Sequence, residues 1–173
     1  MTKFLILGGA DCIWEDIEAS QEIFIPDEII AINDIGIYIE TIDHWVTMHP
    51  LKMSIWLKQR NDNGFAKPIM WTANHKFEEI KGLKGFKGVN SSAGGGVLAV
   101  QLARFRGATK VVLAGVPMTR EHCHFNKVHS WMEADLYKQF WRGQKRYPYI
   151  VKSMSGWTKE LYGLPTEEWL KET

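Results

Sequence analysis

The chain has 173 residues, a formal net charge of +1, 45% hydrophobic residues and 24% charged residues. This length predicts one domain over residues 1–173 with a sizeable core. The nearly balanced charge offers no electrostatic basis for binding nucleic acid or an anionic membrane, and no apolar run approaches the ~20 residues of a membrane span. Two cysteines without a disulfide framework, and an N-terminus unlike a signal peptide, favour a cytoplasmic protein.

The first half of the chain alternates short apolar runs with polar or glycine-containing turns. This pattern predicts strands at 3–7, 28–32, 44–48 and 68–72. A short helix is expected at 14–20, and a second from Pro50 to about Arg60, because proline fits the first turn of a helix. Residues 35–41 fit either a strand or a short helix, and 74–90 are expected to form an irregular connection, with or without a short strand.

The stretch from Ser91 to Gly115 combines a glycine-rich turn, a helix and a strand. The expected helix carries apolar residues at helical spacing, namely Leu98, Leu102 and Phe105. Val111 to Ala114 form a continuous apolar run, which is typical of a parallel strand covered on both faces. The turn at Gly94 to Gly96 either brings a phosphate to the helix N-terminus or only allows close packing of helix and sheet.

The last third of the chain is expected to add a polar loop, a helix, a strand, a second helix from about Trp157 and a final short helix. The first of these helices is expected to have an apolar face made of Val128, Trp131, Met132, Leu136 and Phe140. A strand is expected at 149–152, and Thr166 can cap a final short helix. Three basic residues lie at or just after the C-terminal end of the helix that follows the glycine-rich turn. Their side chains are expected to be solvated: Arg104, Arg106 and Lys110.

The alternation of strands and helices predicts an α/β fold, a single Rossmann-like domain whose mostly parallel sheet has helices on both faces. Ligands of such sheets bind beyond the carboxyl ends of the strands. This rule selects the loops at 8–11, 33–34, 49–50, 72–74 and 115–125, together with the turn at 91–96. Neither a GxGxxG nor a Walker sequence occurs, so a classical NAD enzyme or P-loop NTPase is not expected.

Several histidines in these loops are candidates for chemistry. His122 and His124 are two residues apart, which places both side chains on one side of an extended segment. Neutral imidazole is suited to proton transfer, so either is a candidate general base. Together with His129 they alternatively supply three ligands of a catalytic metal, or the segment is simply an exposed loop. His49 is expected to face a ligand, whereas His44, at the other end of the same strand, is expected to be structural.

The strand-end motifs resemble those of a small family of bacterial sialyltransferases and of the related DUF115, or MptE-like, Rossmann proteins. The resemblance covers about residues 3–125. Its motifs are Gly8-Gly9-Ala10-Asp11, Asn33, His49-Pro50, Ser91-Ser92-Ala93-Gly94 and the run from Gly107 to Gly115. The family has Asn-Pro where this chain has His49-Pro50, and an acidic residue where it has Val116-Pro117-Met118. The SMSGWT segment is also similar to one in short proteins of tailed phages.

The resemblance implies a nucleotide-sugar-dependent glycosyltransferase with no metal or other cofactor, acting in the cytoplasm, or in the host cytoplasm if phage-encoded. It implies that the nucleotide contacts Gly9, Asn33, Ser91, Ser92 and Gly94, with Gly8 and His49 added by their places at strand ends. The implied base is His122 or His124. Two other functions stay open: a phage nucleotide-binding protein without catalysis, and a metal-dependent hydrolase built on His122, His124 and His129. The tryptophans are compatible with a homo-oligomer.

Overall fold

The computed structural model describes residues 1–73, 82–85, 93–126, 132–144 and 147–172. Within these residues, seven strands form one sheet in the order β5-β4-β3-β2-β1-β6-β7, and every neighbouring pair is parallel. The strands are β1 (Thr2–Leu7), β2 (Glu28–Ile32), β3 (His44–Thr47), β4 (Ile69–Thr72), β5 (Leu83–Gly85), β6 (Ala108–Ala114) and β7 (Val151–Ser153). The predicted Rossmann-like α/β fold is therefore confirmed.

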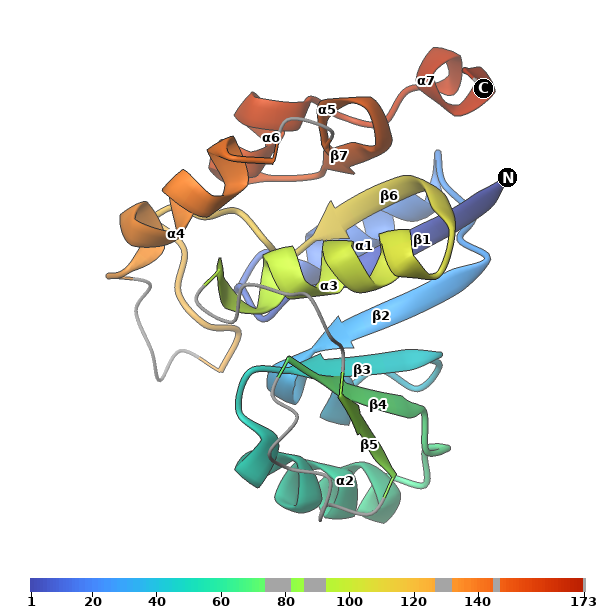
Figure 1. The fold of residues 1–173 in the computed structure, drawn as a ribbon, viewed down its shortest axis with the longest axis vertical. Helices are drawn as coiled ribbons and strands as arrows, with labels where there is room; N and C mark the ends of the chain where they lie inside the picture. The colour runs from blue at the N-terminus through green and yellow to red at the C-terminus, as the bar shows by residue number, and fades with distance from the viewer. Residues whose placement is uncertain (74–81, 86–92, 127–131, 145–146, 173) are drawn as a thin grey trace.

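Helices pack on both faces of the sheet (Figure 1). They are α1 (Ile13–Gln21), α2 (Met53–Asp62), α3 (Gly94–Phe105), α4 (Ala134–Arg142), α5 (Tyr147–Ile150), α6 (Gly156–Tyr162) and α7 (Glu167–Lys171), with short 3-10 helices η1 (Asn33–Ile37) and η2 (Pro50–Lys52). Within the described residues, none of these helices is long and apolar enough to cross a membrane.

The interior strand β1, which lies between β2 and β6, is buried on both faces. Phe4 and Ile6 join the core that contains α3, whereas Leu5 and Leu7 join the core that contains Ile13 of α1. This alternation follows from the strand geometry, because successive side chains point to opposite faces of a sheet. A strand that is apolar at consecutive positions must therefore be covered on both sides, as the sequence of β1 predicts.

The predicted strands β1 to β4 agree with the structure to within one residue at each end, whereas β6 begins three residues before the apolar run that predicted it. Residues 35–37 form the end of the short helix η1, and β5 is the short strand that the prediction for 74–90 allowed. The last strand starts later than expected, at Val151, because Tyr147–Ile150 form a helical turn before it. The remainder of the irregular connection, at 74–81 and 86–90, lies outside the described residues.

The predicted apolar face of the helix after the histidine loop is partly wrong. Leu136 and Met132 are 63% and 65% exposed, whereas Ala134 and Trp141 are buried and Tyr137 and Phe140 pack partly against the core. The helix begins at Ala134, so its buried positions follow from a later start than the sequence pattern suggested. Val128 and Trp131 lie outside the described residues. Phe105, likewise expected in the core, ends α3 and is 67% exposed.

Lys110 corrects the prediction of solvated basic side chains. Arg104 and Arg106 are exposed, but Lys110 is only 4% exposed, and its ammonium lies 4.7 Å from the centroid of the Trp169 ring. Burial lowers the pKa of Lys110. Trp169 belongs to α7 at the end of the chain, so this cation–π contact could not be read from the neighbouring sequence.

Replacing Gly8 with alanine is expected to destabilise the protein by about 1–3 kcal/mol, through overpacking at the ends of β1 and β6. A Cβ at Gly8 would overlap the carbonyl oxygen of Gly115 and lie 2.6 Å from Cγ2 of Val116. Urea denaturation measures the loss. The control is Gly143→Ala, because a Cβ there meets only atoms at 3.5 Å or more. Equal midpoints for the Gly8 variant and the wild type would contradict the prediction.

Candidate functional site

A cavity of about 420 Å³ opens at the carboxyl edge of the sheet. Its size is within the range of small-molecule sites in proteins. The wall is built by the ends of β1, β2, β3 and β6 and by the first turn of α3, with side chains from the loop after β6 and from α4. The lining residues are Gly8, Gly9, Ile32, Asn33, Asp34, Met48, His49, Ala93, Gly94, Gly95, Gly96, Gly115, Val116, Met118, His124, Tyr137 and Trp141.

The cavity lies where the strand order of the sheet reverses. From β1 the chain adds strands on one side as far as β5, then crosses through α3 to β6 on the other side of β1. The connections after β1 and after β6 therefore diverge and leave a crevice between them, which is the usual ligand position in open α/β sheets. Gly8, Gly9, Gly115 and Val116 border this crevice.

The N-terminus of α3 forms one wall of the cavity, and its glycines have a packing role as well. A Cβ at Gly95 would lie 2.6 Å from Cγ2 of Ile32, and one at Gly96 would lie 2.7 Å from Cζ2 of Trp141. Gly94 has a φ of +81°, which only glycine adopts easily. Among the described residues no side chain caps this 12-residue helix, and its first turn, with the positive end of the helix dipole, lines the cavity.

Asn33 is held in a defined orientation at the end of β2. Its φ is +55°, and its Oδ1 accepts a hydrogen bond of 2.9 Å from the hydroxyl of Thr47. Its backbone carbonyl accepts from Nε1 of Trp45. The hydrogen bond to Oδ1 fixes the orientation of the amide. Its N–H groups are the donors that Asn33 brings to the cavity wall.

His124 and Asp34 form a hydrogen-bonded ion pair inside the cavity. The distance from Nε2 of His124 to Oδ1 of Asp34 is 3.1 Å. Burial lowers the pKa of His124, but the hydrogen bond and the charge of Asp34 outweigh it and leave this pKa above its usual value. The loop is fixed by an antiparallel bridge between His124 and Ala10, so the histidine is positioned by backbone pairing with the turn after β1.

His49 lines the same cavity, but its surroundings shift its pKa in the direction opposite to that of His124. Its backbone N–H donates to Oγ1 of Thr47 at 2.8 Å, which fixes the turn after β3. Burial and the nearby ammonium of Lys52 lower the pKa of the His49 ring. One cavity therefore contains a histidine that favours the protonated form and another that favours the neutral form, which is how acid and base roles are commonly separated in one site.

These two histidines are expected to titrate on opposite sides of the ordinary histidine pKa of 6.5. NMR titration of the imidazole carbon-bound protons measures both values, and His124→Gln and His49→Gln assign the signals. Near pH 6.5 the His124 ring should be mostly protonated and the His49 ring mostly neutral. A reversed order of the two pKa values would refute this assignment.

The same shifts predict the sign of the pH dependence of stability. The pKa of His124 is higher in the folded state, so its contribution is fully present below about pH 6.5 and is lost as the pH rises through the folded pKa. The pKa of His49 is depressed, so its unfavourable contribution develops as the pH falls from about 6.5 through the folded pKa. His124→Gln should abolish the loss of stability that occurs as the pH rises above about 6.5, and should leave the change at lower pH unaffected.

The structure brings most of the predicted site residues to the cavity wall. These are Gly8, Gly9, Asn33, His49, Gly94 and His124. His122 is not among the lining residues, because its Nδ1 lies 2.6 Å from Oδ1 of Asp11. Ser91, Ser92 and His129 lie outside the described residues. The ligand-binding and catalytic roles of all these residues stay predictions.

Three residues that line the cavity had no role predicted from the sequence: Asp34, Tyr137 and Trp141. Asp34 directly follows Asn33 in a loop that the strand-end rule selected, so its position was available from the sequence. Tyr137 and Trp141 come from α4, and nothing local in the sequence shows that this helix reaches the start of α3. The structural role expected for His44 is confirmed, since it is buried between Glu28 and Trp71 with hydrogen bonds of 2.6 and 3.2 Å.

The fold and the cavity define a Rossmann-like α/β protein with a small-molecule-sized cleft at its topological switch point. Neither a family model nor a curated protein matches the chain. Among solved structures, it is similar to the sialyltransferase CstII from Campylobacter jejuni, which was solved in complex with the substrate analogue CMP-3FNeuAc. The TM-score is 0.62 at 13% sequence identity, and the alignment covers 100% of this chain and 88% of that chain. This similarity shows a shared sialyltransferase-like fold.

Proposed function

We propose that this protein binds a nucleotide-sugar in the cavity and transfers the sugar to an acceptor hydroxyl, with His124 as the base. The observation that carries the proposal is the convergence of the α3 N-terminus with the strand-end loops at the switch point. A helix N-terminus with free N–H groups is suited to a phosphate. Further support comes from CstII, which has a similar fold and was solved with a CMP-sugar analogue.

The charges around the cavity favour a donor with a single phosphate. Among the described residues, the lining contains neither lysine nor arginine, and the carboxylate of Asp34 is paired with His124. One negative charge suits the partial positive charge of about half a unit at the N-terminus of α3. Diphosphate groups are usually held by additional cations, namely metal ions or basic side chains. The preferred donor is therefore a sugar linked to a nucleoside monophosphate.

His124 is the better placed of the two histidines that sequence analysis selected as bases. In the proposed step the acceptor oxygen bonds to the anomeric carbon, the bond from that carbon to the phosphate oxygen breaks, and the nucleotide leaves with the electron pair. The hydroxyl proton passes to Nδ1 of His124, while the hydrogen bond from Nε2 to Asp34 holds the ring and stabilises the imidazolium. Nδ1 accepts a hydrogen bond of 3.4 Å from the N–H of Asn126.

Binding is tested by calorimetry and thermal unfolding with CMP, UDP, a CMP-linked sugar and a UDP-linked sugar. At 100 times its dissociation constant a true ligand should stabilise the protein by about 2.7 kcal/mol. Asn33→Asp is expected to weaken binding by about 10–100-fold, because it replaces amide donors by a charge that repels phosphate. Asn61→Asp introduces the same change on an exposed part of α2 and should leave binding unchanged.

The outcomes separate the candidate functions. Product release together with binding of the CMP-linked sugar supports the transferase. Tight binding without product, retained in His124→Gln, supports the non-catalytic nucleotide-binding protein instead. If none of the four compounds stabilises the protein, the nucleotide-sugar proposal is wrong.

A further inference from the structure

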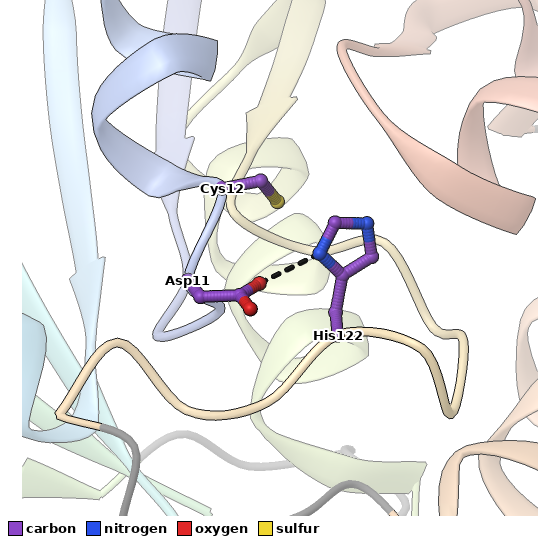
Figure 2. A group of neighbouring side chains, drawn as sticks. All are labelled: Asp11, Cys12 and His122. Carbon is purple, nitrogen blue, oxygen red and sulfur yellow. Dashed lines mark hydrogen bonds and ion pairs between the residues drawn. The ribbon is translucent and has the colours of Figure 1, made fainter.

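A second group of chemically capable side chains lies outside the cavity lining. Asp11, Cys12 and His122 each direct one donor atom to a common point, and these atoms lie within 4.8 Å of one another (Figure 2). Each of the three residues is partly buried. The carboxylate oxygen of Asp11 lies 2.6 Å from Nδ1 of His122, and the thiol of Cys12 completes the group.

The backbone holds these donors together from two distant segments. Asp11 and Cys12 lie in the turn between β1 and α1, and His122 lies in the loop after β6. The N–H of Asp11 donates to the carbonyl of Cys123 at 2.9 Å, and the N–H of Phe125 donates to the carbonyl of Gly9 at 2.9 Å. The two segments are thereby fixed by backbone pairing on both sides of the bridge between Ala10 and His124.

The donor set indicates a particular kind of ion. A thiolate, an imidazole and a carboxylate are the ligand types that zinc takes in proteins. Magnesium and calcium prefer oxygen ligands, so the sulfur and nitrogen donors argue against either ion. Three protein ligands with partial solvent access match a site that keeps one coordination position for water. The side chains of His122 and Asp11 are 29% and 32% exposed, which leaves a path for an ion to enter.

A buried carboxyl group, that of Asp16, lies beside the three residues, and burial raises its pKa. Asp16 is only 7% exposed, and its Oδ2 accepts hydrogen bonds from the N–H of Gly115 at 2.8 Å and the hydroxyl of Ser155 at 2.6 Å. The same oxygen lies 3.7 Å from Sγ of Cys12. In the described part of the chain, no lysine or arginine forms an ion pair with Asp16. A cation held by the three neighbouring residues would stabilise the charged form of this carboxyl group.

We infer that Asp11, Cys12 and His122 bind one zinc-class divalent cation through a carboxylate oxygen, Sγ and Nδ1. Binding displaces the thiol proton of Cys12 and the proton shared between Asp11 and His122. Tetrahedral coordination places nitrogen and oxygen ligands about 3.3 Å apart, so this pair opens by less than 1 Å from its hydrogen-bonded distance of 2.6 Å. The ion ties the β1–α1 turn to the loop that carries His124. The site does not depend on the nucleotide-sugar proposal.

The test uses the full chain, freed of metal by a chelator and then titrated with Co²⁺ and Zn²⁺. We expect one equivalent of Co²⁺ to give a thiolate-to-cobalt charge-transfer absorption and the visible bands of tetrahedral cobalt, and Zn²⁺ to displace it. Cys12→Ser should remove the charge-transfer absorption. His122→Gln should keep that absorption but weaken binding by at least about 100-fold, which is more than the loss typical of groups that only support a ligand.

Cys123→Ser is the matched control. Its sulfur lies 3.2 Å from Oδ2 of Asp11, and a serine hydroxyl can donate the same hydrogen bond, so this variant should bind cobalt with an unchanged spectrum. Circular dichroism establishes that each variant is folded, and His122→Gln tests the site if Cys12→Ser does not fold. The inference is overturned if the wild type binds less than one equivalent, if Cys12→Ser keeps the charge-transfer absorption, or if Cys123→Ser loses it.

Discussion

Arg60→Ala is expected to lower the free energy of unfolding by roughly 3–5 kcal/mol. Arg60 belongs to α2, is only 1% exposed, and has no carboxylate partner among the described residues. Its guanidinium instead donates to four backbone carbonyls, those of Gly36 and Ile39 at 2.6 Å and of Glu40 and Ala66 at 2.7 Å. Alanine would leave these acceptors unpaired beside a cavity.

The aromatic rings around Arg60 add to its effect. The ring centroids of Trp45 and Phe65 lie 6.0 and 5.4 Å from the guanidinium carbon, so the charge makes cation–π contacts with two rings. Lysine cannot reproduce the planar fork of donors, so Arg60→Lys should recover only part of the loss, with a remaining cost of about 2 kcal/mol.

Urea denaturation measures these losses as a lower midpoint at an unchanged m-value. The control is Lys58→Ala on the same helix, because Lys58 is exposed and its one ion-pair partner in the described part of the chain is the exposed Asp62. An exposed pair of this kind is worth about 0.3–0.5 kcal/mol. A loss of less than about 1 kcal/mol in Arg60→Ala would show that the four carbonyls find other partners, and would refute the prediction.

His124→Gln is expected to reduce turnover of the nucleotide-sugar by about 10²–10⁴-fold, the usual contribution of a general base. Glutamine keeps a hydrogen-bonding side chain of similar length, so nucleotide affinity should change by less than about threefold, no more than a single weak hydrogen bond contributes. Steady-state kinetics and calorimetry on the same preparation separate the two quantities. An unchanged turnover number would exclude His124 as the base.

Asp34→Asn separates the role of the carboxylate from that of the ring. Asparagine can still accept a hydrogen bond from Nε2 of His124, but it does not stabilise the imidazolium by charge. We therefore expect a smaller loss of turnover than in His124→Gln, together with a lower pKa of His124, since Asp34 raises that pKa. Lys58→Ala again serves as the control, and a pKa of His124 that does not fall in Asp34→Asn would contradict this role.

The metal inference and the proposed transfer reaction assign different roles to the two neighbouring histidines. His124 pairs with Asp34 inside the cavity, whereas His122 pairs with Asp11 outside its lining. A two-residue spacing predicts side chains on one side of an extended segment, but it does not reveal which carboxylates they meet. The choice between the two histidines therefore required the tertiary structure.

Only the tertiary structure decided which distant groups meet. The burial of Lys110 depends on Trp169, and the walls formed by Tyr137 and Trp141 depend on where α4 packs. The four carbonyl partners of Arg60 likewise belong to connections that no local pattern assigns to it. Such contacts arise from the docking of whole elements, which is a property of the complete core.

The sequence by itself determined the parallel α/β fold and the edge at which the cavity lies. Apolar runs such as Val111–Ala114 and Phe4–Leu7 identify strands buried on both faces, because their patterning is local. Gly8, Asn33 and His49 follow such strands, and parallel strands end at one edge, so these residues gather at the cavity. The pairing of His122 with Asp11 beside Cys12 was set by chain folding, since backbone hydrogen bonds join the turn after β1 to the loop after β6.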